Sequence, residues 1–190
     1  MRNADLYKGK YRIESARLKG WDYSSTGYYF VTICTRYREC IFGRIVEDKM
    51  VLTGIGRIVK RFWLGIPEHF ENAKLDEFVI MPNHVHGIIA IGNQYYRDAI
   101  NGVSTYKGGI TQTHNPTISE NSLSKIIRWY KGRSTFEINR VQNKIGFAWQ
   151  SRFYDHIIRN EKSLLEIREY IHNNPLKWDI DENNPAFIKK

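Results

Sequence analysis

The folds open to this chain are limited mainly by the order of its strand-like and helix-like segments. Strand-like segments are dense in aromatic and β-branched residues, whereas helix-like segments repeat apolar residues every three or four positions. The order is strand, hairpin, helix, strand, strand, helix, strand, helix. It favours an α+β fold over a doubly wound parallel sheet, because too few helices are present to alternate with every strand. The corresponding residues are 27–35, 40–53, 53–70, 74–83, 84–92, 119–140, 147–159 and 160–174.

An antiparallel sheet with helices packed on it fits this order best, in a ferredoxin-like or RRM-like arrangement. The length of 190 residues suits one domain with a core large enough to fold unaided. Pro67 and Pro175 are expected to end the helices that precede them. The predicted organisation is a single domain over 1–190, with an irregular N-terminal arm at 1–26, a long flexible loop at 92–117 and an irregular tail at 176–190.

The charge of the chain favours a polyanionic partner. Twenty-nine Lys and Arg residues outnumber 20 Asp and Glu residues, which gives a net charge of +9. Nucleic acid is the first candidate and an anionic membrane surface the second, although a merely soluble basic protein has the same balance. No apolar run approaches the length of a membrane span, and the N-terminus has no apolar signal-peptide core. Because Cys34 and Cys40 form no disulfide framework or zinc motif, we expect reduced thiols and a soluble, cytoplasmic protein with no membrane partner.

Two histidines begin the strand-like segment "HVHGIIAIG". Side chains alternate along a strand, so His84 and His86 project from the same face, near enough to share a metal ion. Gly87 removes bulk beside them, which would let a backbone or ligand approach closely. Six histidines in 190 residues make a chance pair common, so two hydrogen-bonded structural histidines are the competing interpretation. Two imidazoles also leave a divalent ion short of ligands, and further residues must complete such a site.

The last helix carries a phenol and an amide on one face. Tyr170 lies beside the apolar stripe of this helix, and Asn174 follows one turn later. Together they could act as a nucleophile and a metal ligand, although a Tyr in this position is more often a packing residue. Tyr154 is the next candidate nucleophile.

Two quoted stretches together carry a resemblance to a known family. "MPNHVHGII" combined with "WQSRFYDHIIRNEKSLLEIREYIHNNPLKW" resembles the REP-associated tyrosine transposases, members of the single-tyrosine HUH endonuclease superfamily, in which HUH denotes His, a hydrophobic residue and His. "RLKGWDYSSTGYYFVTICTRYRECIFG" and "IPEHFENAKLDEFVIMPN" are similar to the same family, so the likeness covers roughly residues 10–180.

The resemblance implies a ferredoxin-like fold with His84 and His86 as metal ligands on a central strand. It implies Tyr170 as the nucleophile and Asn174 as the third ligand of a Mg²⁺ or Mn²⁺ ion. Because Pro175 disfavours helical geometry at the residue before it, His172 or Gln150 remain alternatives for that ligand.

The implied activity is metal-dependent cleavage and strand transfer of DNA through a 5′-phosphotyrosine intermediate. The implied substrate is single-stranded or hairpin DNA formed by palindromic repeats, bound by a monomer or a homodimer. Two other functions stay open from the residues alone. One is an RRM-like nucleic-acid-binding module without catalysis, and the other is a metal-dependent nuclease that uses water.

A basic, aromatic helix is the first candidate for contacting DNA. Cations there would hold phosphates while aromatic rings stack on bases, although a solvated charged face with a packed Trp has the same pattern. Arg152 and Arg159 are further candidates, with Lys144, whereas His69, His114 and His156 suit structural or surface roles better. The helix residues are Lys125, Arg128, Trp129, Lys131 and Arg133, with Tyr130 interleaved.

Overall fold

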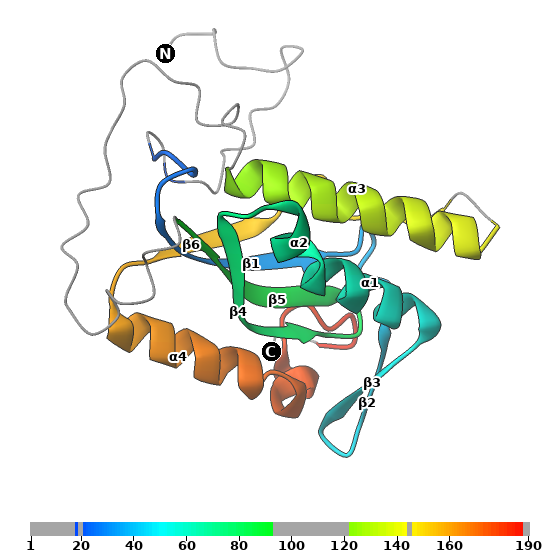
Figure 1. The fold of residues 1–190 in the computed structure, drawn as a ribbon. Helices are drawn as coiled ribbons and strands as arrows, with labels where there is room; N and C mark the ends of the chain where they lie inside the picture. The colour runs from blue at the N-terminus through cyan, green and yellow to red at the C-terminus, as the bar shows by residue number, and fades with distance from the viewer. Residues whose placement is uncertain (1–17, 19–20, 93–121, 144–145, 188–190) are drawn as a thin grey trace, which may run out of the picture.

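A four-stranded antiparallel sheet forms the centre of the molecule, with its strands in the order β4-β5-β1-β6 (Figure 1). This is the α+β, ferredoxin-like arrangement expected from the sequence, and β5 with its two histidines is a central strand. The strands are β1 (Gly27–Cys34), β4 (Ala73–Ile80), β5 (His84–Ile91) and β6 (Tyr154–Ile158). The computed structural model describes residue 18 and residues 21–92, 122–143 and 146–187.

A separate hairpin follows the first strand, at the place where the sequence predicted one. It consists of β2 (Gly43–Val46) and β3 (Lys49–Leu52), paired antiparallel. Glu47 and Asp48 form its turn with φ angles of 46° and 59°. Both central residues of a two-residue turn take positive φ when the turn matches the twist of the flanking strands.

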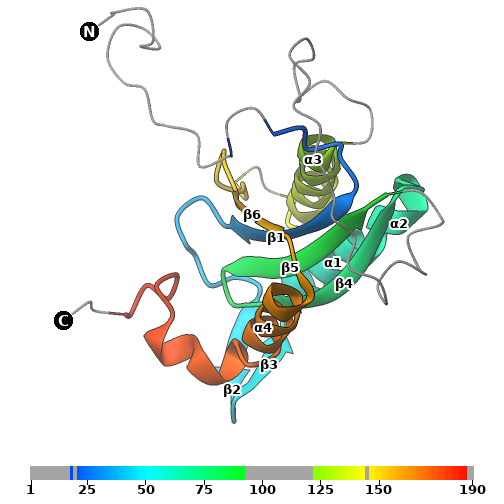
Figure 2. The same cartoon turned by 90° about the vertical axis from the view of Figure 1, so that its left-hand side faces the viewer.

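Helices cover the two faces of the sheet unequally (Figure 2). One face, called here the α1–α3 face, carries three helices that pack on the sheet and on each other. The other, called the α4 face, carries one helix and the short 3₁₀ helix η4 that follows it (Figures 1 and 2). The helices are α1 (Gly54–Leu64), α2 (Ile66–His69), α3 (Leu123–Val141), α4 (Glu161–His172) and η4 (Pro175–Ile180).

Strand alternation divides the apolar side chains between two cores. On β1, Tyr29, Val31 and Ile33 enter the larger core beneath α1 and α3. Phe30, from the same strand, enters a smaller core beneath α4, where it meets Ile88 of β5. Successive residues of a strand point to opposite faces, so each strand supplies both layers.

Gly87 of β5 faces the α1–α3 core, and the space beside it is filled. A Cβ atom built on Gly87 would lie 2.3 Å from Cζ2 of Trp63, a fully buried residue of α1. The absence of a side chain at Gly87 therefore makes room for the Trp63 indole. A ligand was expected to be able to approach closely at Gly87, and that expectation is wrong, because the Trp63 indole fills the space.

Two predicted elements have different bounds in the structure. Pro67 lies in the first turn of α2, and the preceding helix already ends at Leu64. Proline suits a first helical turn because the missing N–H needs no partner there. The expected strand 147–159 is regular only in β6, with one isolated bridge between Thr35 and Trp149 before it.

The expected irregular tail begins with the helical turn of η4. Residues 21–26 of the expected N-terminal arm form no helix or strand, and the chain turns at 23–26. The rest of that arm apart from residue 18, and residues 93–117 of the expected loop, lie outside the described residues.

Candidate active site

His84 and His86 lie side by side on the α4 face, as strand alternation predicted. Their ring centroids are 4.4 Å apart, and their partners across the sheet are Cys34 and Thr32 of β1. Both imidazoles are almost completely buried. Burial and the nearby Arg38 guanidinium lower the pKa of His84 to about 3. Burial, followed by the neighbouring His84, also lowers the pKa of His86 well below its usual value, so both rings are neutral at pH 7.

Asn83 fixes which nitrogen of His84 is available to a ligand. Its amide nitrogen donates to the backbone oxygens of Arg38 (2.9 Å) and Asn183 (2.7 Å), which orients the side chain. Its Oδ1 atom then lies 2.8 Å from His84 Nδ1 and accepts the ring proton. Nε2 of the neutral imidazole is left with its lone pair, which is the form that coordinates a metal.

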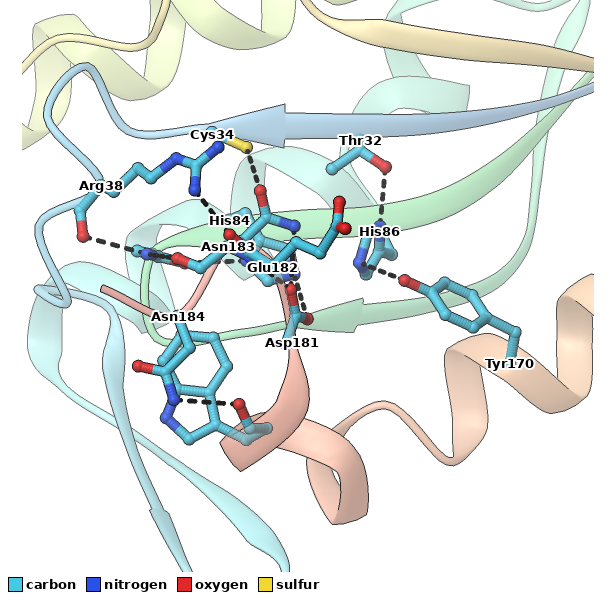
Figure 3. A network of polar contacts seen from close by, with 12 residues as sticks. Thr32, Cys34, Arg38, His84, His86, Tyr170, Asp181, Glu182, Asn183 and Asn184 are labelled. Atoms are coloured by element: carbon cyan, nitrogen blue, oxygen red, sulfur yellow. Dashed lines mark hydrogen bonds and ion pairs between the residues drawn. The ribbon is translucent and has the colours of Figure 1, made fainter. Parts of the chain in front are cut away.

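The ring of His86 is held between two hydroxyl groups. Its Nδ1 atom lies 2.8 Å from Oγ1 of Thr32, and its Nε2 atom lies 3.3 Å from the Tyr170 hydroxyl. Figure 3 shows Tyr170 reaching from α4 toward this ring. Phe30 packs against both rings, stacked on His86 at 5.5 Å and edge-on to Tyr170 at 6.0 Å. The predicted nucleophile therefore lies directly beside the predicted metal ligand, although the two are 84 residues apart.

The Tyr170 hydroxyl is protonated at neutral pH. Burial, with the added influence of Asp181, raises the pKa of this phenol, and a hydrogen bond with Asn174 acts in the opposite direction. The Tyr170 side chain is nevertheless 40% exposed, so a substrate can reach it.

Asp181 joins the two histidines from the segment after η4, where the sequence had indicated only an irregular tail. Each of the three residues offers one ligand atom, and these atoms lie within 4.8 Å of one another. Asn183 binds Oδ1 of Asp181 through its backbone N–H at 2.7 Å and its side-chain amide at 3.1 Å. Oδ2 is left facing Nε2 of His84 at 3.6 Å, too far for a hydrogen bond (Figure 3).

Three buried polar atoms of this cluster lack a hydrogen-bond partner. They are Nε2 of His84, Oδ2 of Asp181 and Oδ1 of Asn174. All three are acceptors, and leaving such atoms unpaired in the interior is costly. A cation satisfies several acceptors at once, so the donor set fits a divalent metal ion.

Asn174 takes the helical backbone conformation that Pro175 was expected to disfavour. Its φ and ψ are −61° and −40°, and its side chain is buried beside the Tyr170 hydroxyl. Among the alternatives for the third ligand, His172 is exposed and does not join the His84–His86–Asp181 cluster. Gln150 is partly exposed, and its backbone N–H donates to Cys34.

Comparisons with known proteins agree with the geometry. A family model described as "Transposase IS200 like" matches residues 115–174. A putative REP-associated tyrosine transposase of Haemophilus influenzae is 27% identical over 158 residues, covering 82% of this chain and 74% of that protein. The chain is thus similar to a REP-associated tyrosine transposase over most of its length.

Two further proteins are similar to this chain. An uncharacterised protein of Haemophilus influenzae is 41% identical over 175 residues, which cover 92% of this chain and 94% of that protein. A solved structure of a REP-associated tyrosine transposase bound to a REP hairpin shares the fold, with a TM-score of 0.52 and 19% identity. The match covers 88% of this chain and 73% of that one.

The basic helix predicted to contact DNA lies on the face opposite the histidines (Figure 1). Lys125, Arg128 and Arg133 are exposed there. Trp129 is stacked on His69, with the ring centroids 4.6 Å apart, and Lys131 donates to the backbone oxygens of residues 150 and 151. A role for these side chains in DNA binding stays a prediction, and both Trp129 and Lys131 have structural contacts.

The remaining predicted DNA contacts lie at the active-site sheet. Arg152 and Arg159 are exposed just before and just after β6, which is an edge strand. His156 is exposed on β6 itself, whereas Lys144 and His114 lie outside the described residues.

In the part of the chain that the structure describes, no helix is both long and apolar enough to cross a membrane.

Sequence reasoning missed three residues of the site: Thr32, Asn83 and Asp181. Thr32 lies opposite His86 in the pairing of β1 with β5. The sequence does not give the register of these two strands, so it could not place Thr32 there. Asn83 is the last residue of the expected segment 74–83 and carried no signal of its own. Asp181 had no local signal at all, since it reaches the site only through the fold of the chain after α4.

Proposed function

We propose that this protein is a REP-associated tyrosine transposase, which cleaves and rejoins single-stranded or hairpin DNA through a covalent 5′-phosphotyrosine on Tyr170. The observation that carries the proposal is the 3.3 Å separation of the Tyr170 hydroxyl from Nε2 of His86. A nucleophile beside a cluster of unpaired acceptors is the arrangement that metal-assisted phosphoryl transfer requires.

His84, His86 and Asp181 would hold the divalent ion, with Asn174 as a further oxygen ligand. A carboxylate and an amide oxygen suit Mg²⁺ or Mn²⁺, and the two imidazoles favour Mn²⁺ of the two. When bound, such an ion supplies positive charge that lowers the pKa of a nearby phenol and neutralises the oxygens of a phosphate.

Tyr170 carries out the covalent step in this proposal. Its oxygen attacks phosphorus, the P–O bond to the 3′ oxygen breaks, and the DNA leaves with a free 3′-hydroxyl. The phenolic proton departs during the attack, and the departing 3′ oxygen gains a proton. Because the phosphotyrosine remains a diester, a second 3′-hydroxyl can attack it and rejoin the strand without an external energy source.

The orientation of Tyr170 distinguishes this proposal from the two alternatives. A nuclease that uses water needs no phenol over the ligand cluster, and a binding module without catalysis needs no cluster of unpaired acceptors. Palindromic repeats are the expected source of the hairpin, in line with the REP hairpin named for the structural relative. The chain would act as a monomer or a homodimer.

The test uses end-labelled hairpin DNA with single-stranded flanks, incubated with the protein and Mn²⁺ and resolved on a denaturing gel. We expect a protein–DNA adduct from the wild type and none from Tyr170→Phe, which removes the attacking oxygen and keeps the ring. Tyr154→Phe is the matched control, since Tyr154 is the next candidate nucleophile, and it should form the adduct as the wild type does.

Two outcomes would contradict the proposal. Cleavage that persists in Tyr170→Phe would point to water as the nucleophile. Binding of the hairpin without any cleavage, in the presence of Mn²⁺, would point to a module that only recognises DNA.

A further inference from the structure

The edge strand β6 presents two exposed side chains on the same face as the active site. Tyr154 pairs in register with Thr32, and His156 pairs with Phe30. Residues directly opposite each other in a sheet share a face, so Tyr154 and His156 point to the α4 face. Tyr154 is 52% exposed and His156 is also exposed. An exposed aromatic side chain on a sheet surface next to a catalytic centre calls for an explanation.

Helix α4 covers only one end of β6, where Ile158 joins the small core with Leu164, and leaves the Tyr154 end exposed. It packs against β4, the strand at the opposite edge. The larger apolar side chains of α4, Leu164 and Ile171, close the small core over the middle of the sheet. The outer part of the α4 face, at Tyr154, is therefore open to a ligand.

Tyr154 is only one side chain away from the nucleophile. The ring of Phe30 lies 6.3 Å from that of Tyr154 and 6.0 Å from that of Tyr170, in both cases edge-on. The same Phe30 ring stacks on His86. A strand of DNA whose phosphate lies at Tyr170 would place a neighbouring nucleotide beside Tyr154.

The charges around β6 suit a polyanion. Arg152 precedes the strand and Arg159 follows it, and both are exposed. Cations that bind phosphates, combined with aromatic rings on which bases stack, are the usual means of holding single-stranded nucleic acid. The exposed cations of α3 do not lie beside the candidate site, since α3 is on the other face of the sheet.

We propose that β6 binds the single-stranded DNA beside the scissile phosphate, and that Tyr154 stacks on one of its bases. The assignment rests on the proposed function, because it takes single-stranded DNA as the substrate. It adds a base-binding subsite to that function and identifies the surface along which the strand lies.

Binding is measured with a fluorescent oligothymidine of about ten nucleotides, within the usual site size for such surfaces, and with an abasic oligomer of equal length. Every protein in this experiment carries Tyr170→Phe and EDTA is present, so no cleavage contributes to the signal. The wild type in this comparison is the protein that keeps Tyr154. Loss of one stacked base should raise the Kd of Tyr154→Ala for oligothymidine about 5- to 150-fold. Tyr154→Leu keeps the apolar contact with Phe30 and should lose nearly as much affinity, whereas Tyr154→Phe should bind within about twofold of the wild type, since it keeps the ring that stacks.

Phe136→Ala is the control for an exposed aromatic residue on the far face, since Phe136 lies on α3 and is 63% exposed. It should leave the Kd unchanged. The abasic oligomer should bind the wild type and Tyr154→Leu equally, because no base remains to stack. The salt dependence of binding should be the same in both proteins, since the phosphate contacts remain.

The proposal is overturned if Tyr154→Leu binds oligothymidine as tightly as the wild type. It is equally overturned if that variant loses as much affinity for the abasic oligomer, or if the wild-type protein binds neither oligomer. Failure of the proposed function is detected separately, because it concerns the covalent adduct on Tyr170 and not the affinity measured here.

Discussion

The two faces of the sheet differ in how they are stabilised. Among the described residues, the α1–α3 core contains 21 buried apolar side chains and the α4 core contains five. The α4 face instead holds the buried polar residues of the candidate site, His84, His86 and Asn174. One face therefore supplies most of the apolar burial that stabilises the domain, and the other holds the buried polar groups of the candidate site.

This difference suggests that the sheet separates stability from function. Buried acceptors without partners destabilise a protein unless a ligand satisfies them. A thick apolar core on the far side of the same strands offsets that cost, since β1 and β5 contribute residues to both cores. Substitutions on the two faces should then have different consequences.

The largest expected effect is on the α1–α3 face. Trp63→Ala removes a fully buried indole from above Gly87 and should lower the free energy of unfolding by about 3–5 kcal/mol. Trp178→Ala makes the same substitution on the α4 side, where the ring is partly exposed and lies 6.1 Å from that of His84. It should cost clearly less in urea unfolding. Equal losses in the two variants would contradict the division between the faces.

Much of the fold could be predicted because its signals are local. Aromatic and β-branched runs identified β1 and β5, and the apolar repeat identified α1 and α4. The same-face position of His84 and His86 follows from strand alternation alone. Pro67 was misinterpreted because a proline after a helical stretch can end one helix or begin the next, and only Gly65 between them decides which.

The rest of the site depends on contacts between distant segments. Nothing in the sequence near Asp181 indicates that η4 and the turn after it bring this carboxylate to His84. The basic helix was identified correctly as α3, but a helical pattern does not reveal which face of the sheet the helix covers. Tyr170 was found through the likeness to a family, since a Tyr beside an apolar stripe is more often a packing residue.

The second prediction concerns the unpaired acceptors of the α4 face. Mn²⁺ should raise the melting temperature of the wild type, with a stabilisation of about 2.7 kcal/mol at a concentration of 100 times the Kd. His86→Ala and Asp181→Ala should lose most of this gain, because each removes a member of the ligand cluster. His172→Ala is the matched control and should keep it, since His172 is exposed and outside the cluster.

Asn174→Ala tests whether the Asn174 side chain contributes an oxygen ligand to the metal ion. A reduced gain with Mn²⁺ would assign Asn174 to the metal together with Asp181. A gain that is unchanged in both His86→Ala and Asp181→Ala would contradict a metal site on this face.

The smallest expected effect concerns the attachment of α4 to the sheet. The pairing of β4 with β5 shifts register between Leu75 and Phe78, so that Asp76 and Glu77 together lie opposite one residue of β5. Asp76 binds Arg168 of α4 through two hydrogen bonds of 2.7 and 2.6 Å. Arg168 lies two residues before Tyr170, so this ion pair holds the part of α4 that carries the proposed nucleophile.

Asp76→Asn should lower stability by about 1 kcal/mol at pH 7, because Arg168 is 37% exposed and solvent screens the pair. Burial raises the pKa of Asp76, but hydrogen bonds from Arg168 and the Glu77 backbone outweigh it and lower the pKa below the ordinary value of 3.8. The stabilisation is therefore complete above the pKa of the unfolded chain and disappears as the pH falls through the folded-state value. Urea unfolding of both proteins across this range measures the difference.

The comparison on the other face is Glu137→Gln, which removes the carboxylate that binds Arg61 and Arg140 at the exposed surface of α3. Hydrogen bonds from Arg140 and Arg61 lower the pKa of Glu137 to about 2, yet both guanidinium groups are more than 60% exposed. This substitution should change stability less than Asp76→Asn and leave the adduct on Tyr170 at its wild-type rate. Asp76→Asn should slow adduct formation, because α4 is attached to the sheet through the smaller core and depends more on its ion pair. No slowing in Asp76→Asn would show that the apolar contacts of α4 alone position Tyr170. Equal slowing in Glu137→Gln would show that the effect does not depend on the attachment of α4.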